Sequence, residues 1–434
     1  MFAYYLDLAL RSLRRNRVLT MLMVLSLALG IGATITTLTV LRLLSGDPLP
    51  QKSAQLFYPQ IDPNSKEGYI EGQTKPDLTM TYPDAMNLLR AQRGTHQAAM
   101  ALTQAKIMPK QAHARPFFGD GVMTTADFFT MFDAPFQYGS GWTAADDDSR
   151  AQLVVIASFL NDKLFGGANS VGRVIRIDDH DLRIVGVLKP WAPQPRFYAQ
   201  ELGGRSYGDG DAVFLPLHTA RAIKMGPQDT ECYAAVPDIS DLETAPCEWL
   251  GVWVELDSAE AVTRYKAFLA GYVKQQVALG RFQRTETSLL NLMSWLRQQQ
   301  VVPDDVRLQA GLAFGFLLIC VVNTVGLLLA KCLRRSQEIG VRRALGATRK
   351  DIFAQFMVEA GIVGLAGGVL GLLFAELGLL GIRHQPAEYA SLAHLDLSMF
   401  LFTFVVALVA SLFAGILPAW RACVVAPAPQ LKAA

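Results

Sequence analysis

Histidine, cysteine and net charge are all scarce in this sequence, which has six histidines, five cysteines and a formal net charge of +2 in 434 residues. The histidines are scattered, and no cysteine has a His or Cys neighbour at the spacing of a metal site. No Ser-His-Asp set can be argued from the spacing, so we expect neither catalytic residues nor a bound metal. The small net charge also argues against nucleic acid as a partner.

The chain contains no Gly-x-x-x-x-Gly-Lys-Ser/Thr loop, the motif whose backbone amides and lysine hold the phosphates of ATP. These residues therefore cannot hold ATP in the usual way, and we expect no cofactor on this chain. The acidic clusters Asp146-Asp147-Asp148 and Asp178-Asp179 lack the spacing of a known calcium loop, and we interpret them as solvated turns.

Apolar residues are abundant, at 51% of the chain. A bilayer is crossed by about 20 residues of helix. Four apolar runs reach that length: Val18–Leu44, Leu308–Ala330, Phe353–Ile382 and Leu397–Trp420. The first run follows basic residues, as a secretory signal would, but it is longer than the usual apolar region and no cleavage site follows promptly. We expect an uncleaved anchor and a multi-pass membrane protein.

Basic residues cluster beside some ends of these runs, and an excess of Lys and Arg marks the cytoplasmic side of a membrane. They predict that both termini and the loop between the second and third runs are cytoplasmic. The expected order is an amphipathic interface helix 1–17, spans 18–44, 308–330, 353–382 and 397–420, an extracytoplasmic domain with its stalk 45–307, a cytoplasmic loop 331–352, a short outer loop 383–396 and a cytoplasmic tail 421–434. For residues 1–17, a simple extension of the first span is the alternative.

The segment 45–307 mixes strand-like and helical patterns, which favours an α+β domain. Arg173–Ile177 and Leu182–Leu188 alternate around an acidic turn, as in a hairpin. Lys189–Asp211 is rich in Pro and Gly and is predicted to be an exposed excursion, whereas Leu289–Gln300 is predicted to be helical. Pro303 and the two acids after it suit the start of the next helix.

Two cysteines, Cys232 and Cys247, fall in this domain, where oxidising conditions permit a disulfide. A disulfide is the interpretation we favour, and two free thiols are the alternative. The other three cysteines lie within a span or at the cytoplasmic ends of spans.

A charged segment between the second and third runs carries the most specific pattern. The stretch Glu338-Ile339-Gly340-Val341-Arg342-Arg343-Ala344-Leu345-Gly346-Ala347 resembles the signature of the FtsX/MacB-like ABC transporter permeases. Weaker matches to the family's periplasmic core domain are Phe128-Phe129…Phe132…Pro135 and Leu164-Phe165-Gly166…Val171-Gly172-Arg173…Val185-Gly186-Val187. The ending Leu417-Pro418-Ala419-Trp420-Arg421-Ala422 resembles its exit from the fourth span. The resemblance covers nearly the whole chain.

This resemblance implies an α-helical membrane protein with four transmembrane helices and a large α+β extracytoplasmic domain between the first and second. It also implies that the signature forms a coupling helix, which contacts a cytoplasmic ABC ATPase. A solvated, positive-inside loop would explain the arginines alone. The residues expected at the ATPase contact are Glu338, Ile339, Gly340, Val341, Arg342, Arg343, Leu345, Gly346 and Arg349, with Ile339, Val341 and Leu345 as apolar anchors.

Polar and small residues within the spans suggest internal contacts. Glu359 is expected to form an ion pair with a coupling-loop arginine or a contact with the N-terminal helix, although it could instead extend to the interface. Asn323 is expected to hydrogen-bond across a helix interface. Gly364/Gly368 and Gly367/Gly371 have the spacing of close helix packing, either within the four spans or across a dimer.

The resemblance implies a function as the permease subunit of a transporter in the bacterial inner membrane. ATP and Mg²⁺ are expected on a separate ATPase, although the macrolide-exporter member of the family carries its own nucleotide-binding domain. Motion, rather than a pore, would pass from the ATPase to the periplasmic domain. We expect two copies, or one copy and a paralogue, and efflux from the periplasm with a periplasmic adaptor and an outer-membrane channel as further partners. The alternatives are lipoprotein extraction, regulation of a cell-wall hydrolase, and a membrane-anchored peptide sensor.

Overall fold

The computed structural model of this chain describes residues 8–9, 11–13, 15–64, 76–109, 115–234, 236 and 241–424. The chain folds into two compact units, one formed by Met1–Ser45 with Val302–Ala434 and the other by Gly46–Val301. Most of the predicted amphipathic segment 1–17 and most of the tail 421–434 lie outside the described residues, although residues 8–9 and 11–13 are helical.

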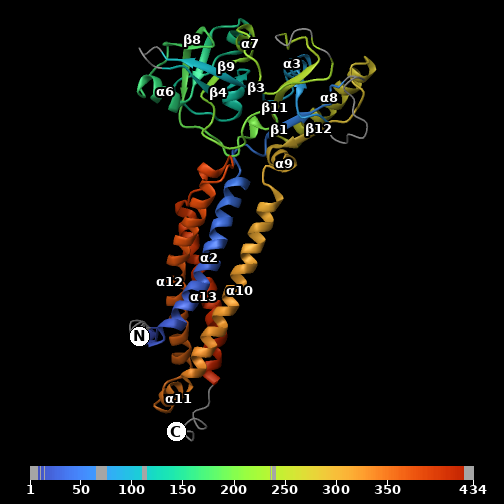
Figure 1. Ribbon diagram of the computed structural model, residues 1–434. Helices are drawn as coiled ribbons and strands as arrows, with labels where there is room; N and C mark the ends of the chain where they lie inside the picture. Colours follow the sequence, from blue (N-terminus) through green and yellow to red (C-terminus); the bar gives the residue numbers. More distant parts are fainter. Residues whose placement is uncertain are drawn as a thin grey trace. The chain divides into compact units, whose positions relative to one another are not determined.

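The first unit is a bundle of long helices (Figure 1). Within the described residues, four helices are long and apolar enough to cross a membrane, which agrees with the predicted fold class. They are α2 (Arg17–Ser45), α10 (Asp304–Arg334), α12 (Arg349–Arg383) and α13 (Leu397–Val424). Each continues beyond its apolar run, and two shorter helices join them: α11 (Ser336–Ala344) and the 3₁₀ turn η2 (Ala390–Leu392).

Glycines bring α12 close to two of its neighbours. A Cβ added to Gly371 would meet the Ile31 side chain of α2 at 3.0 Å, and one added to Gly367 would meet Leu27 at 3.1 Å. On the α13 side, Gly364 faces Ser411 in the same way. The glycine stripe therefore packs helices within this chain.

The second unit contains a twelve-stranded sheet in its described residues, in the order β12-β1-β11-β3-β4-β9-β6-β8-β5, with β2 and β10 paired to β11 and β7 paired to β3 and β8. The strands are β1 (Leu56–Gln60), β2 (Met80–Thr81), β3 (His96–Met108), β4 (Phe117–Thr124), β5 (Phe136–Gly139), β6 (Leu153–Ile156), β7 (Val174–Ile177), β8 (His180–Leu188), β9 (Val213–Pro216), β10 (Glu231–Cys232), β11 (Cys247–Glu255) and β12 (Ser288–Asn291). The β7–β8 pair occupies the predicted hairpin. Cys232 and Cys247 face each other across β10 and β11 and form a disulfide.

Helices pack against this sheet. They are α3 (Tyr82–Arg90), α4 (Phe128–Met131), α5 (Ala144–Asp148), α6 (Ser158–Phe165), α7 (Leu217–Ala222), α8 (Ala259–Ala278), α9 (Leu292–Gln298) and the 3₁₀ turn η1 (Phe197–Ala199). Figure 1 shows α6 and α7 beside β4, β8 and β9, and α3, α8 and α9 beside β1, β11 and β12. The mixture agrees with the predicted α+β domain.

Two local predictions for this unit were wrong. Lys189–Asp211 is not an exposed excursion, because Phe197 and Tyr198 are buried in an aromatic cluster and Arg196 forms a buried ion pair with Asp211 at 2.6 Å. The start of the predicted helix Leu289–Gln300 is instead strand β12, since it pairs with β1, and α9 begins only after the N-cap residue Asn291.

Candidate functional site

The signature segment forms helix α11, which is held between two turns. Arg335 ends α10 with φ −106° and ψ 10° and directly precedes α11. After α11, Gly346 takes φ +104°, a conformation that glycine adopts at little cost. Thr348 then caps α12 by a reciprocal pair of hydrogen bonds with Asp351. The local sequence therefore makes a short, separate helix at one end of the bundle (Figure 1).

One side of α11 is buried against the bundle. Ile339 is 5% exposed and packs in a cluster with Ile352 and Phe356 of α12 and with Ala419 and Ala422 of α13. Gly340 is buried as well. This side attaches α11 to the membrane helices.

The opposite side of α11 is exposed and partly apolar. Leu345 is 83% exposed and Val341 is 47% exposed, and residues four apart lie on the same side of a helix. Arg349 and Lys350, at the start of α12, are also exposed. We call these four residues the α11 face. The predicted apolar anchors thus divide: Ile339 holds the helix in place, while Val341 and Leu345 point outward.

The remaining polar residues of the signature contact this same chain. Arg342 donates to the Glu338 carboxylate at 2.7 Å and to Oε1 of Gln355 on α12 at 3.1 Å. Arg343 donates to the carbonyl oxygen of Cys423 on α13 at 3.2 Å. These contacts hold α11 to the bundle, so its polar side chains have a structural partner whether or not another protein is bound.

Glu359 of α12 lies in a buried polar cluster beside α11. Its Oε1 accepts from Lys331 of α10 and, at 2.9 Å, from the hydroxyl of Ser12. Its Oε2 lies 3.7 Å from Nη1 of Arg335. The structure thus gives Glu359 both kinds of neighbour expected from the sequence, and it adds Lys331, which sequence reasoning treated only as a marker of topology.

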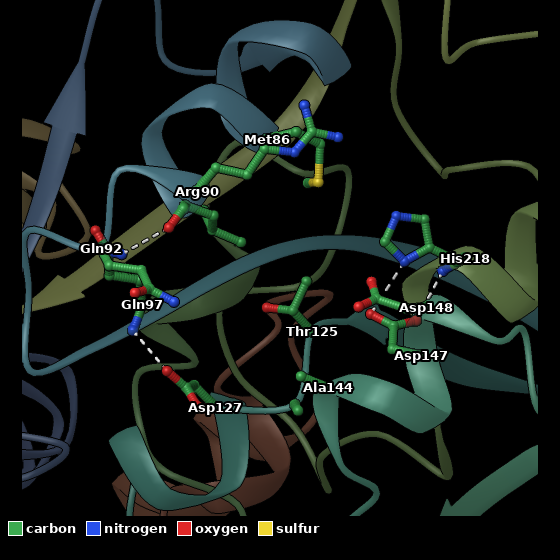
Figure 2. A pocket seen from close by; sticks show the side chains of 12 residues that line it. Met86, Arg90, Gln92, Gln97, Thr125, Asp127, Ala144, Asp147, Asp148 and His218 are labelled. Atoms are coloured by element: carbon green, nitrogen blue, oxygen red, sulfur yellow. Dashed lines mark hydrogen bonds and ion pairs between the residues drawn. The ribbon is translucent and has the colours of Figure 1, made fainter.

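A pocket lies in the other unit. It has a volume of about 330 Å³ and lies between α3, α5, the start of β3 and the start of α7, lined by residues that include Arg90, Gln97, Asp127, Asp147, Asp148 and His218. Figure 2 shows His218, Asp147 and Asp148 on one side and Gln97 and Asp127 on the other. The elements that form it are far apart in sequence, so no spacing pattern could have revealed it.

Asp147 and His218 are the coupled charges of this pocket. The Asp147 carboxylate accepts from the backbone N–H of His218 at 3.0 Å and lies 3.3 Å from its ring Nδ1. The interaction with Asp147 raises the pKa of His218, against the opposing effect of burial. Tyr82 contacts the other ring nitrogen at 2.9 Å. Asp147 is 4% exposed, so the expectation of a solvated acidic turn was wrong at this position, because the Asp147 carboxylate contacts His218.

Two family models match this chain. The MacB-like periplasmic core domain matches residues 20–267, which is more than half of the chain, and the FtsX-like permease C-terminal domain matches residues 310–427. The chain belongs to the MacB/FtsX-like ABC transporter permeases. The first match covers most of α2 and of the sheet unit, and the second covers most of α10 and all of α11, α12 and α13. Helix α11 therefore lies inside the permease domain of the family.

Relatives support the same family. The pyoverdine export ATP-binding/permease protein PvdT of Pseudomonas aeruginosa is 28% identical over 310 residues, which cover 70% of this chain and 41% of the relative. The macrolide export ATP-binding/permease protein MacB of Chlorobium luteolum is 22% identical over 451 residues, covering 99% of this chain and 60% of the relative. The chain spans about half the length of the curated relatives it matches.

A solved structure of the periplasmic region of MacB from Actinobacillus actinomycetemcomitans is also similar. It is 12% identical, has a TM-score of 0.37, and covers 58% of this chain and 94% of its own chain.

Proposed function

We propose that this chain is the membrane subunit through which a separate cytoplasmic ABC ATPase drives export by moving the membrane helices. The observation that carries the proposal is the division of α11 into two sides. Ile339 and the inward-facing arginines fix one side to α12 and α13, while Val341 and Leu345 leave an apolar surface exposed on the other. A helix built in this way transmits a push from a partner to the bundle.

An ATP-hydrolysing partner is supported by the names of the relatives. PvdT and MacB are named ATP-binding/permease proteins, whereas these residues contain no phosphate-binding loop of their own. In this proposal, ATP and Mg²⁺ bind to the partner and the α11 face lies against it. Since ABC ATPases act in pairs, two permease copies, or one copy and a paralogue, complete the assembly.

Transmission of motion is favoured over a hydrophilic pore by the polar groups of the spans. Several buried hydroxyls donate to backbone carbonyl oxygens four residues earlier on their own helices: Thr34 to Gly30, Thr39 to Ile35, Thr324 to Cys320 and Thr403 to Met399. Groups bonded in this way do not offer ligands to a passing solute. The buried charges of the described spans, Lys331 and Glu359, neutralise each other near α11.

Charge and family support the proposed direction of transport and the proposed compartment. The basic residues around α11 favour a cytoplasmic position, with both termini on that side of the inner membrane and residues 46–301 in the periplasm. The names of PvdT and MacB refer to export, which favours efflux of a periplasmic substrate here. A periplasmic adaptor and an outer-membrane channel would complete an export route of this kind.

Co-purification tests this function. An affinity-tagged chain is isolated from its own host membranes and its partners are identified by mass spectrometry. We expect an ABC ATPase in stoichiometric amount, and we expect Leu345→Glu to lose it because a charge would be buried in the proposed apolar contact. The matched control is Leu279→Glu, which changes a leucine of the sheet unit that is 66% exposed. Equal ATPase recovery from both variants, or recovery of no ATPase with the unsubstituted chain, would contradict the proposal.

A further inference from the structure

The two carboxylate oxygens of Glu359 have unequal surroundings. Oε1 accepts from Lys331 and from Ser12. Oε2 is buried and has no hydrogen-bond donor among the described residues, and the guanidinium of Arg335 stands 3.7 Å away, beyond hydrogen-bond length. Oε2 would therefore form a strong, charge-assisted hydrogen bond if the Arg335 guanidinium moved within hydrogen-bond distance.

The Arg335 guanidinium makes its hydrogen bonds with two residues, Ser12 and Glu338. Its Nη1 donates to the Ser12 hydroxyl at 2.6 Å, and its Nε and Nη2 each lie 3.3 Å from an oxygen of Glu338. Glu338 belongs to α11, whereas Glu359 belongs to α12. Arg335 is the residue between α10 and α11. Its side chain lies between Glu338 of α11 and Glu359 of α12.

The distances make this arrangement sensitive to small motions. Charge-assisted N–H···O bonds are about 2.7–2.9 Å long, so Nη1 needs to move by only about 1 Å to bond Oε2. The bonds to Glu338 are long for such pairs, and the Glu338 carboxylate is a third exposed and keeps its shorter bond to Arg342. A shift of α11 by that amount exchanges an interaction at the rim for one in the buried cluster.

We propose that Arg335 is the movable link between α11 and the membrane helices, bonding Glu338 in the resting state and the free oxygen of Glu359 when α11 is pushed. Glu359 is the anchor, because it is tied to α10 through Lys331 and to the N-terminal segment through Ser12. Because Arg335 lies at the junction of α10 and α11, the new bond ties that junction to α12. This inference rests on the proposed contact between α11 and an ATPase, and Arg335 acts as a positioning residue for it.

A cysteine placed beyond the far end of α12 reports the motion. Gln385→Cys is suitable because Gln385 is exposed two residues after α12 ends, and the free cysteines of the described residues are all buried. The rate of maleimide labelling is measured on the complex with its ATPase, without nucleotide and after trapping with ATP and vanadate. We expect the two rates to differ in the otherwise unsubstituted chain.

Three variants distinguish a role of Arg335 in transmitting motion from a purely structural ion pair. Arg335→Gln should still bind an active ATPase and lose the nucleotide-dependent difference, whereas Arg335→Lys, which keeps the charge, should retain part of it. The double exchange Lys331→Glu with Glu359→Lys preserves a buried pair of opposite charge but sets a lysine against Arg335. We expect this variant to assemble and yet to lose the difference.

Each outcome decides the question. If the double exchange keeps the labelling difference, or if Arg335→Gln leaves it intact, the contacts of Glu359 are only a structural ion pair. The proposal that Arg335 links α11 to the membrane helices is then refuted. An unsubstituted complex that hydrolyses ATP without any change in labelling refutes it as well. By contrast, failure to recover any ATPase with the unsubstituted chain rejects the proposed function itself, so the two failures are distinguishable.

Discussion

Gly368 of α12 packs directly against Ala407 of α13, so closely that a Cβ added to Gly368 would stand 2.8 Å from the Cβ of Ala407. Small residues on both helices allow this approach, as in many membrane helix pairs. The contact is part of the stripe that also brings α12 against α2, so α12 is fixed to helices on two sides. If α11 moves the bundle as proposed, close packing of this kind would let α12 carry that motion to its neighbours.

Enlarging Gly368 should therefore destabilise the bundle. We expect Gly368→Leu to cost about 1–3 kcal/mol through overpacking, or to force α12 and α13 apart. The matched control is Gly361→Leu in the same helix, where an added Cβ meets no atom within 4 Å. The stability of each variant is measured by thermal unfolding of the purified protein in detergent. Equal losses of stability in the two variants would show that the stripe does not pack within the chain.

The contact of His218 with Asp147 predicts a stability that depends on pH. Because Asp147 raises the pKa of His218 in the folded state, the protonated ring stabilises the fold below its unfolded pKa of about 6.5. That contribution is lost as the pH rises through the folded pKa. We expect His218→Gln to lower the melting temperature at about pH 5 and to have a smaller effect at about pH 9. An equal change in melting temperature at both pH values would contradict this explanation.

Glu248 of β11 predicts a pH dependence of the same sign over a different pH range. Burial, followed by the nearby acids Asp77 and Glu231, raises the pKa of Glu248 to about 10. The folded state must therefore keep a proton that the unfolded chain releases above a pKa of about 4.3, and stability falls as the pH rises between these values. We expect Glu248→Gln to be neutral at about pH 4 and to raise the melting temperature at about pH 8. A variant that is destabilised equally at both values would contradict this explanation.

The spans and α11 could be predicted because their signals are local. Long apolar runs, basic flanks and a compact signature are each contained within a few dozen residues, and the structure has helices at each of them. The stripe of small residues in α12 was visible in the sequence as well. Which helices it packs was not, since that depends on residues such as Ile31 and Ala407 from distant segments.

The features that sequence reasoning missed depend on long-range contacts. Lys331 looked like an ordinary basic residue at the end of a span, and its burial against Glu359 requires α10 and α12 to be neighbours. In the sheet unit, Arg196 and Asp211 lie in a Pro- and Gly-rich stretch whose composition suggests exposure, yet they pair with each other in the interior. Composition reports the average environment of a segment, whereas these pairs depend on where it folds back.

Site-specific photocrosslinking from α11 tests the coupling role itself. A benzophenone amino acid is placed at Leu345 in the full chain, the host membranes are illuminated, and the crosslinked proteins are identified. We predict a crosslink to an ABC ATPase from position 345, and none from the same probe at Leu279 in the sheet unit. If position 345 crosslinks to no ATPase while the chain remains folded and membrane-bound, α11 is not the point at which ATP hydrolysis acts on this protein.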